Sequence, residues 1–412
     1  MNNEQELIPH LFRTEYSKIV SVLSKLFGFD QIEIAEDIAG DTFLTATETW
    51  GLKGIPPNPT AWLYNVAKNK AKNHLQRAKL FENKIAPEIK INLATNQEIE
   101  LDLSESNIND SQLQMMFAIC NPAITMESQI GLSLRILCGF GIDEIADAFL
   151  SNKETINKRL LRAKEKLRTE KVKIELPGIQ EINDRLDVVL TTLYLLFSEG
   201  YYSSSQNKTL RKDLCLEAIR LCYMLVENNA TNKPPVNALL SLMCFHASRF
   251  EARTDDNGEL VLYNDQDSAL WNKDLIEKGE YFLNQAAQGN KISKYHTEAA
   301  IAYWHTIKDD SKNKWENILQ LYNQLLQIEY SPMAALNRTF ALSMANGKNA
   351  AIIEAEKLKL TDNHFYYVLL GELYTDIDNE KAKQHFKTAL VLAKTDTDKK
   401  SIIQKLESLL KN

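Results

Sequence analysis

Five polar side chains between residues 153 and 162 are of types that bind the backbone and base edges of DNA. They are Lys153, Thr155, Lys158, Arg159 and Arg162. Lysine and arginine neutralise phosphates, and all three residue types can bond base edges in the major groove. Apolar residues at helical spacing, Ile156, Leu160, Ala163 and Leu167, should face a core. An ordinary surface helix with a solvated basic face explains this segment equally well when it is considered alone.

A short helix and a turn precede this basic helix. Residues 151–154, Ser-Asn-Lys-Glu, form a capping box with Ser151 at the N-cap and Glu154 at N3. The segment from Gly141, GIDEIADAFL, has the apolar spacing of a short helix. The two helices together predict a helix-turn-helix whose second helix enters the major groove.

A second candidate surface is acidic and belongs to an amphipathic helix predicted over residues 32–50. Its polar face carries Glu33, Asp37, Asp41 and Glu48. A solvated acidic face is the common explanation of such a run, and docking onto a basic protein surface is the alternative.

A third candidate surface lies on a helix predicted over residues 60–79. Its five cations, Lys68, Lys70, Lys72, Arg77 and Lys79, have no acidic residue among them. Asn65, Asn69 and Asn73 recur every four residues and therefore share one stripe. Such a surface suits binding of phosphates together with exposed bases. Trp62 lies on the apolar stripe, where core packing is the simpler explanation of a tryptophan.

Composition restricts the remaining possibilities. A chain of 412 residues with long segments of helical period predicts an all-α protein of two or three domains. The net charge of −7 excludes a polybasic nucleic-acid binder, so DNA contacts must come from local basic patches. The five cysteines are scattered, and no zinc motif, nucleophile elbow, P-loop or HExxH sequence is present. With neither a secretory signal nor a long apolar run, we expect a cytoplasmic protein that is not an enzyme, needs no cofactor or metal, and does not enter a membrane.

The order of these segments resembles a known family. AEDIAGDTFLTATETW and NPTAWLYNVAKNKAKNHLQR resemble region 2 of the bacterial extracytoplasmic-function sigma factors of the sigma-70 family, and GFGIDEIADAFLSNKETINKRLLRAKEKL resembles their region 4. The resemblance implies region 2 at residues 1–85, an acidic linker at 86–110, region 4 at 111–172 and an extension at 173–412.

The resemblance also implies a role for each surface. RNA polymerase core, through its β′ coiled coil and β flap, and promoter DNA would be the partners. Core polymerase would contact Glu33, Asp37, Asp41 and Glu48. The −10 element would contact Trp62, Tyr64, Asn65, Asn69, Lys72 and Asn73. The −35 element would contact Lys153, Thr155, Lys158, Arg159 and Arg162. The −10 helix departs from the family by ending in LQRAKLFENK, without a long arginine run, so its affinity for duplex DNA should be modest.

The C-terminal part resembles the group of these sigma factors that carries a tetratricopeptide-like extension. Residues at tetratricopeptide spacing are Tyr367, Leu370, Gly371 and Tyr374, followed by Ala382, Phe386 and Ala389. We expect a helical solenoid that binds a regulatory protein or peptide. Asp256-Asn-Gly258 followed by Leu260-Val-Leu262 predicts one small hairpin between Phe250 and Tyr263.

Three functions fit these features. The first is a sigma factor that directs promoter-specific initiation under the control of its extension. The second is a conventional helix-turn-helix regulator with a tetratricopeptide-like sensory or protein-interaction domain, which binds duplex DNA without polymerase. The third is a polymerase- or peptide-binding scaffold whose DNA-binding elements have decayed. The acidic helix followed by an asparagine-rich basic helix favours the first, because a conventional regulator has no use for a strand-opening module.

Overall fold

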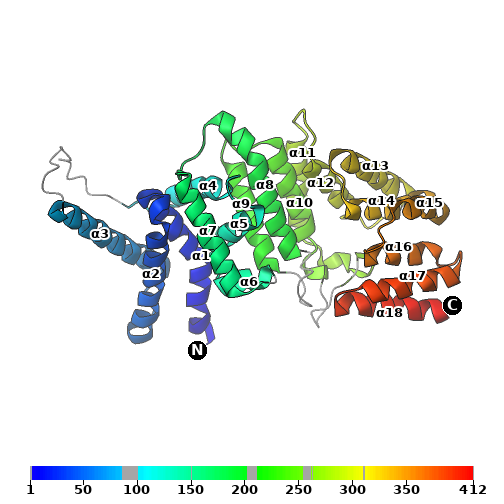
Figure 1. The fold of residues 1–412 in the computed structure, drawn as a ribbon, viewed down its shortest axis with the longest axis horizontal. Helices are drawn as coiled ribbons and strands as arrows, with labels where there is room; N and C mark the ends of the chain where they lie inside the picture. The colour runs from blue at the N-terminus through cyan, green and yellow to red at the C-terminus, as the bar shows by residue number, and fades with distance from the viewer. Residues whose placement is uncertain are drawn as a thin grey trace. The chain divides into compact units, whose positions relative to one another are not determined.

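The computed structural model describes residues 2–85, 101–149, 151–201, 211–253, 261, 263–309 and 311–411. Within these ranges every regular element is a helix and no strand is present, so the predicted all-α class is confirmed. The chain divides into an N-terminal unit, residues 1–195, and a C-terminal unit, residues 196–412 (Figure 1).

The N-terminal unit begins with three helices, which we call the first module. They are α1 (Asn2–Phe27), α2 (Ile32–Lys53) and α3 (Pro59–Ile85), with the 3-10 turn η1 (Phe29–Gln31) before α2. Apolar residues from all three helices, such as Ile19, Leu23, Phe43 and Leu63, are almost completely buried. Helix α2 is followed by its C-cap Gly54, whose φ of 81° is in the region that favours glycine. The module thus holds α2 and α3 in fixed positions on α1.

The second module of this unit contains four short helices and a π-helical turn. They are α4 (Glu105–Ile119), α5 (Met126–Leu132), η2 (Ser133–Leu137), α6 (Ile142–Ala148) and α7 (Lys153–Thr169). Helix α4 begins inside the segment assigned to the linker. The Ser104 hydroxyl caps its N-terminus by accepting a hydrogen bond from the main-chain amide of Asn107, and Ile108 in its first turn is buried. Residues 86–100 of that linker lie outside the described residues.

The start of α7 corrects one prediction. Asn152, and not Ser151, is its N-cap, and the Asn152 side chain accepts a hydrogen bond of 2.8 Å from the amide of Thr155. Both residue types cap helices well, so sequence preference alone could not separate them. The apolar face is as predicted, because Ile156, Leu160 and Leu167 are buried.

Helix α8 (Ile179–Tyr201) begins in the N-terminal unit and ends in the C-terminal unit. Its first turns pack on the second module, where Arg185 donates to the main-chain carbonyl of Phe117. Further along, the Thr192 hydroxyl lies 3.1 Å from Oε1 of Gln129. The extension expected from residue 173 therefore contributes residues 179–195 to the packing of the N-terminal unit.

The C-terminal unit continues with successive helices that pack on their chain neighbours (Figure 1). They are α9 (Lys212–Glu227), α10 (Pro234–Ala247), α11 (Lys273–Ala286), α12 (Lys294–Trp304), α13 (Lys312–Ile328), α14 (Pro332–Asn346), α15 (Lys348–Leu358), α16 (His364–Tyr374), α17 (Asn379–Leu392) and α18 (Asp396–Lys411). Three 3-10 turns, η3 (Glu251–Arg253), η4 (Tyr263–Asp265) and η5 (Ser268–Leu270), connect α10 to α11. The turn of the expected hairpin, residues 254–260, lies outside the described residues.

Helices α16 and α17 occupy the positions at which the tetratricopeptide spacing was recognised. The ring of Phe386 packs directly on Gly371, where an added Cβ atom would lie 2.6 Å from the ring. Leu370, Tyr374, Ala382 and Phe386 are buried in one cluster. The two helices that the spacing predicts are therefore present, while their assignment as a tetratricopeptide-like repeat stays a prediction.

Candidate functional site

Helix α2 presents the predicted acidic face. Asp37, Asp41 and Glu48 are exposed, whereas Phe43 and Trp50 on the opposite side are buried. A carboxylate oxygen of Asp41 lies 3.8 Å from Nζ of Lys70 on α3. The side chain of Asp41 is 66% exposed in spite of this contact. An exposed pair of this kind contributes little stability, so Asp41 can exchange Lys70 for another cation.

Glu33 differs from the other predicted carboxylates because the second module already binds it. A guanidinium nitrogen of Arg168 on α7 lies 2.7 Å from a carboxylate oxygen of Glu33. The ion pair with Glu33 and the one with Glu165 raise the pKa of Arg168, although burial acts in the opposite direction and is the largest single influence. The predicted core-binding face therefore divides into Glu33, which is paired, and Asp37, Asp41 and Glu48, which are exposed.

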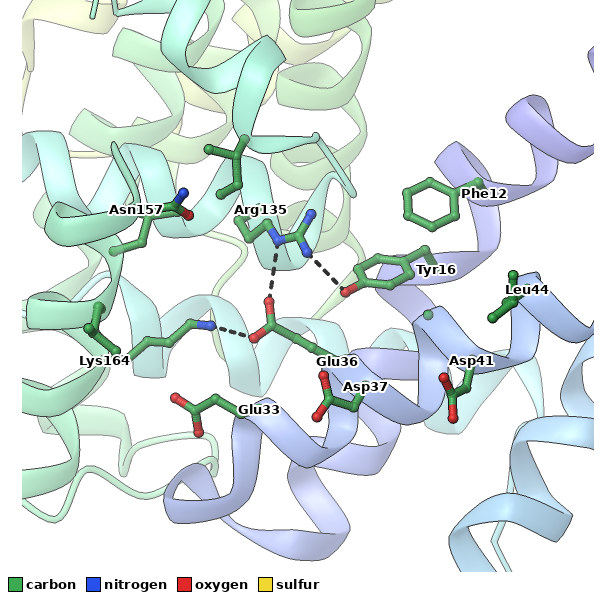
Figure 2. A pocket seen from close by; sticks show the side chains of 14 residues that line it. Phe12, Tyr16, Glu33, Glu36, Asp37, Asp41, Leu44, Arg135, Asn157 and Lys164 are labelled. Carbon is green, nitrogen blue, oxygen red and sulfur yellow. Dashed lines mark hydrogen bonds and ion pairs between the residues drawn. The ribbon is translucent and has the colours of Figure 1, made fainter. Parts of the chain in front are cut away.

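Glu36 is the residue of this face that the sequence analysis missed. Its carboxylate lies between Arg135 and Lys164, with Nε of Arg135 at 3.3 Å and Nζ of Lys164 in direct contact (Figure 2). The side chains of Glu36 and Lys164 are each only 11% exposed. Glu36 lies beside Asp37 in a run of acidic residues, so no signal in the sequence distinguished it from its solvated neighbours. Because both cations belong to the second module, Glu36 links the two modules.

The surroundings of Glu36 include a cavity of about 760 Å³ between α1, α2 and the second module (Figure 2). Arg135 also reaches Tyr16, whose hydroxyl oxygen lies 3.5 Å from its Nη2 atom. Burial raises the pKa of the Tyr16 phenol far above its usual value, and Arg135 partly opposes this rise. At the cavity mouth the exposed apolar side chains of Leu44 and Leu161 accompany Asp37 and Asp41. Such a mixed acidic and apolar surface suits a basic, amphipathic protein segment.

Helix α3 presents the predicted amide and lysine stripe. Asn65, Asn69, Lys72 and Asn73 are all exposed. Trp62 is half-buried and packs edge-on against Trp50, with ring centres 5.3 Å apart, as the core-packing explanation expected. The structure therefore leaves the polar residues of this helix free to meet a ligand while Trp62 anchors the helix to α2.

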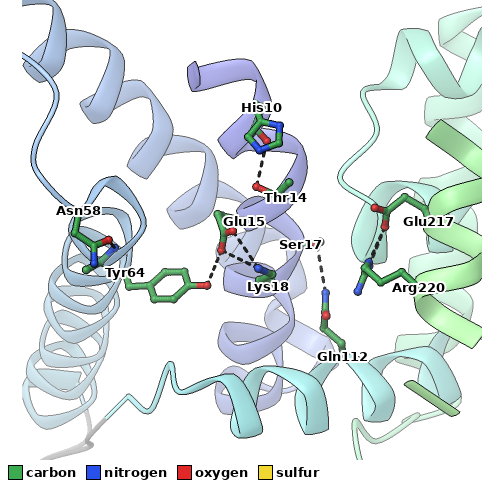
Figure 3. A network of polar contacts seen from close by, with 11 residues as sticks. His10, Thr14, Glu15, Ser17, Lys18, Asn58, Tyr64, Gln112, Glu217 and Arg220 are labelled. Atoms are coloured by element: carbon green, nitrogen blue, oxygen red, sulfur yellow. Dashed lines mark hydrogen bonds and ion pairs between the residues drawn. The ribbon is translucent and has the colours of Figure 1, made fainter. Parts of the chain in front are cut away.

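Tyr64 is tied to the first helix of the module. Its hydroxyl donates a hydrogen bond of 2.6 Å to a carboxylate oxygen of Glu15, which also accepts from Lys18 (Figure 3). Burial and this bond to Glu15 raise the pKa of Tyr64 far above its usual value. Tyr64 is thus held as a neutral donor to Glu15.

A second cavity, of about 560 Å³, lies between α3 and residues 101–103. Its lining combines Tyr64, Asn65 and Lys68 with Leu101, Asp102 and Leu103. Hydrogen bonds from the amide and hydroxyl of Ser104 keep the pKa of Asp102 below its usual value, so its carboxylate stays charged. The sequence analysis missed this contribution because residues 101–103 lie in the segment assigned to the linker.

The predicted −35 residues of α7 lie on its solvent side. Thr155 and Arg162 are exposed, and Lys153 pairs with Asp143 at 2.6 Å. Lys158 pairs with Glu154 at 2.7 Å, and Arg159 lies 5.5 Å above the ring of Phe149. Exposed ion pairs of this kind are weak, so phosphates can replace their acidic partners.

Three other kinds of candidate feature among the described residues are metal-binding sets, cysteine pairs and membrane-spanning helices. Within those residues no set of three His, Cys, Asp or Glu side chains could hold a metal ion. All five cysteines are buried and carry free thiols. No described helix has the length and apolar character needed to cross a membrane.

Comparisons with known proteins agree with this geometry. Residues 11–81, which form most of the first module, match the model of sigma-70 region 2. Residues 185–287 match a family of unknown function, DUF6596. An uncharacterized protein of Rhizobium meliloti (strain 1021) is 31% identical over 387 residues, which are 92% of this chain and 91% of that protein. No solved structure matches the chain. The chain therefore belongs to the same family as this Rhizobium protein, and its sigma-70 region 2 domain supports a sigma-70 family sigma factor.

Proposed function

We propose that this protein is a cytoplasmic sigma factor of the extracytoplasmic-function group, which binds RNA polymerase core and directs initiation at specific promoters. The observation that carries the proposal is the sigma-70 region 2 match over residues 11–81, on a module that exposes both an acidic and a basic face. The acidic face is on α2 and the asparagine-rich basic face on α3, so one small module can meet a basic protein surface and DNA at once.

Core binding would use the exposed carboxylates of α2. Asp37, Asp41 and Glu48 are accessible, and Leu44 next to them is 59% exposed. A basic coiled coil can pair with the carboxylates and cover Leu44, which supplies both charge complementarity and apolar burial. The remaining acidic residues of the helix, Glu33 and Glu36, would stay with the second module or exchange their partners upon docking.

Promoter recognition would use the other two surfaces. The exposed Asn65, Asn69, Lys72 and Asn73 suit single-stranded −10 DNA, because amides bond base edges and lysine neutralises phosphate. Trp62 and Tyr64 would support this surface from the helix packing described above. On α7, the exposed Thr155, Lys158 and Arg162 with Lys153 and Arg159 suit the major groove of the −35 element.

The extension would act as a regulatory part of the same protein. Support comes from α8, whose residues 179–195 pack on the second module through Arg185 and Thr192. Removing the chain after Arg168 would uncover the apolar surface that α8 buries, so we expect a truncated protein of lower stability and lower activity. The helix pairs that follow suit a regulatory protein or peptide as a further partner.

The experiment that tests the proposal is reconstituted transcription. Purified protein is mixed with core polymerase, and run-off transcripts are measured on promoters identified by mapping transcription starts after overexpression. We expect the protein to co-purify with core and to produce transcripts that core alone does not. Binding to the same duplex DNA without polymerase, combined with no transcript and no association with core, would instead indicate a conventional DNA-binding regulator.

A further inference from the structure

The second module holds the acidic helix α2 through three of its own cations. Glu36 contacts both Arg135 and Lys164 (Figure 2), and Glu33 pairs with Arg168 at 2.7 Å. Glu33 and Glu36 are three residues apart on α2 and therefore share one face of that helix. Lys164 and Arg168 are four residues apart on α7 and likewise share one face. Opposite charges thus meet at matching intervals along the two helices.

Helix α1 adds further contacts between the two modules. Arg13 pairs with Glu144 of α6, and its guanidinium lies 4.7 Å from the ring centre of Phe140. The hydroxyl of Ser17 accepts a hydrogen bond of 3.3 Å from the side-chain amide of Gln112 on α4, and both residues are buried. These contacts are charged or polar. Interfaces between parts of a chain that move relative to each other are of this kind, whereas permanent interfaces are more apolar.

This interface overlaps the face of α2 that core polymerase would use. Asp37, Asp41 and Leu44 line the cavity described above, and Leu161 and Lys164 of α7 line it as well (Figure 2). The cations of the second module reduce the negative potential that attracts a basic partner to α2. A basic coiled coil that docks on α2 would therefore meet both like charges and helix α7 itself.

We propose that the second module is an intramolecular competitor of core polymerase, an inference that rests on the proposed function. In the free protein, Arg135, Lys164 and Arg168 occupy the carboxylates of α2 that are nearest to α7. We call this arrangement the closed state. Core binding replaces it, and the release frees α7, which also carries the predicted −35 residues. The apparent dissociation constant for core is the intrinsic constant divided by the fraction of molecules that have left the closed state.

The first test weakens the closed state from the second module and leaves every carboxylate of α2 in place. In the full chain carrying Lys164→Gln with Arg168→Gln, Glu36 keeps its contact with Arg135, so the fold should persist, which circular dichroism and chemical denaturation check. We expect this variant to bind core about three- to thirtyfold more tightly than the unchanged protein, because fewer molecules are closed.

A matched control separates this effect from a change in net charge. Lys166→Gln with Lys173→Gln also removes two positive charges close by in the chain. The side chains of Lys166 and Lys173 are 52% and 77% exposed, and neither contacts α2 in the structure. Core binding by the control should stay within about twofold of the unchanged protein, since exposed ion pairs contribute little.

The second test measures the separation of the modules directly. Spin labels are attached to the full chain at Asp30→Cys on η1 and at Thr169→Cys at the end of α7. Both positions are exposed, and the five native cysteines are buried, so labelling is selective. We expect the distance between the labels to lengthen when core is added. In Lys164→Gln with Arg168→Gln, the longer distances should be present before core is added.

The outcomes distinguish this inference from the proposed function. Tighter core binding by the variant but not by the control, with a longer label distance upon core binding, supports it. Core binding that is equal or weaker in the variant overturns it, as does a label distance that core does not change. Either of these results leaves the proposed function standing, because core is still bound. No core binding by any of the three proteins would contradict the proposed function, and this inference with it.

Discussion

Reversing the two exposed carboxylates of α2 tests the central part of the proposed function. In the variant Asp37→Lys with Asp41→Lys, both changes lie on the solvent side of α2, where no buried contact is lost. The Lys70 ammonium is 3.8 Å from Asp41 and would be repelled, but its own side chain is partly exposed and can move. We therefore expect the fold to persist, which the unfolding midpoint and circular dichroism check.

The expected loss of core binding follows from the size of exposed ion pairs. Each such pair contributes about 0.5–1 kcal/mol, and reversing one partner replaces that attraction with a repulsion of similar size. Two reversals should then cost about 2–4 kcal/mol, which is about a 30- to 1,000-fold increase in the dissociation constant. The loss should shrink at high salt, because exposed charges are screened.

The measurement is the equilibrium binding of immobilised full-length protein to core polymerase at low and high ionic strength. A matched control, Glu277→Lys with Glu280→Lys, produces the same change in net charge on exposed positions of α11. Core binding by the control should stay within about threefold of the unchanged protein, because α11 is not part of the proposed docking face and exposed charges are screened. If Asp37→Lys with Asp41→Lys binds core as tightly as the unchanged protein, α2 is not the docking face. If the control loses as much affinity, net charge and not the α2 face determines binding.

Three further predictions concern stability. Glu36→Gln removes the carboxylate that Arg135 and Lys164 share, so the free energy of unfolding of the N-terminal unit, measured by chemical denaturation, should fall by about 2–3 kcal/mol. Its control, Glu48→Gln on the same helix, should change this free energy little. The pKa of His305 is about 3 in the folded protein and about 6.5 in the unfolded chain, so between these values the unfolded chain binds one more proton. The free energy of unfolding should therefore decline as pH falls below about 6.5, by about 2 kcal/mol at pH 5. A flat profile of unfolding midpoint against pH would contradict the burial of this imidazole. Gly371→Ala places a methyl group against the Phe386 ring and should destabilise the C-terminal unit by about 1–3 kcal/mol. In the control Gly178→Ala the added methyl group meets open space. Equal unfolding midpoints for the two variants would refute the close packing of α16 on α17.

The sequence by itself determined the properties that depend on local periodicity. The buried residues of α2 and α7 recur with the 3.6-residue period of a helix and therefore share one face. Phe43 and Leu160 lie on the buried faces, and Asp37 and Arg162 lie on the exposed ones. The exposed asparagine stripe of α3 follows from the same kind of reasoning. These features need only the helix and its neighbour in the chain.

The tertiary structure decided everything that depends on segments far apart in the chain. Glu36 meets Lys164 across 128 residues, and nothing in its own segment distinguishes it from Asp37. The placement of Asp102 beside α3, the packing of α8 on the second module and the gathering of Arg249, Lys308 and Lys314 around Tyr263 have the same origin. A charge pattern shows which side chains can form ion pairs. Which of them do so depends on the packing of apolar faces, because that packing brings distant surfaces together and excludes water between them.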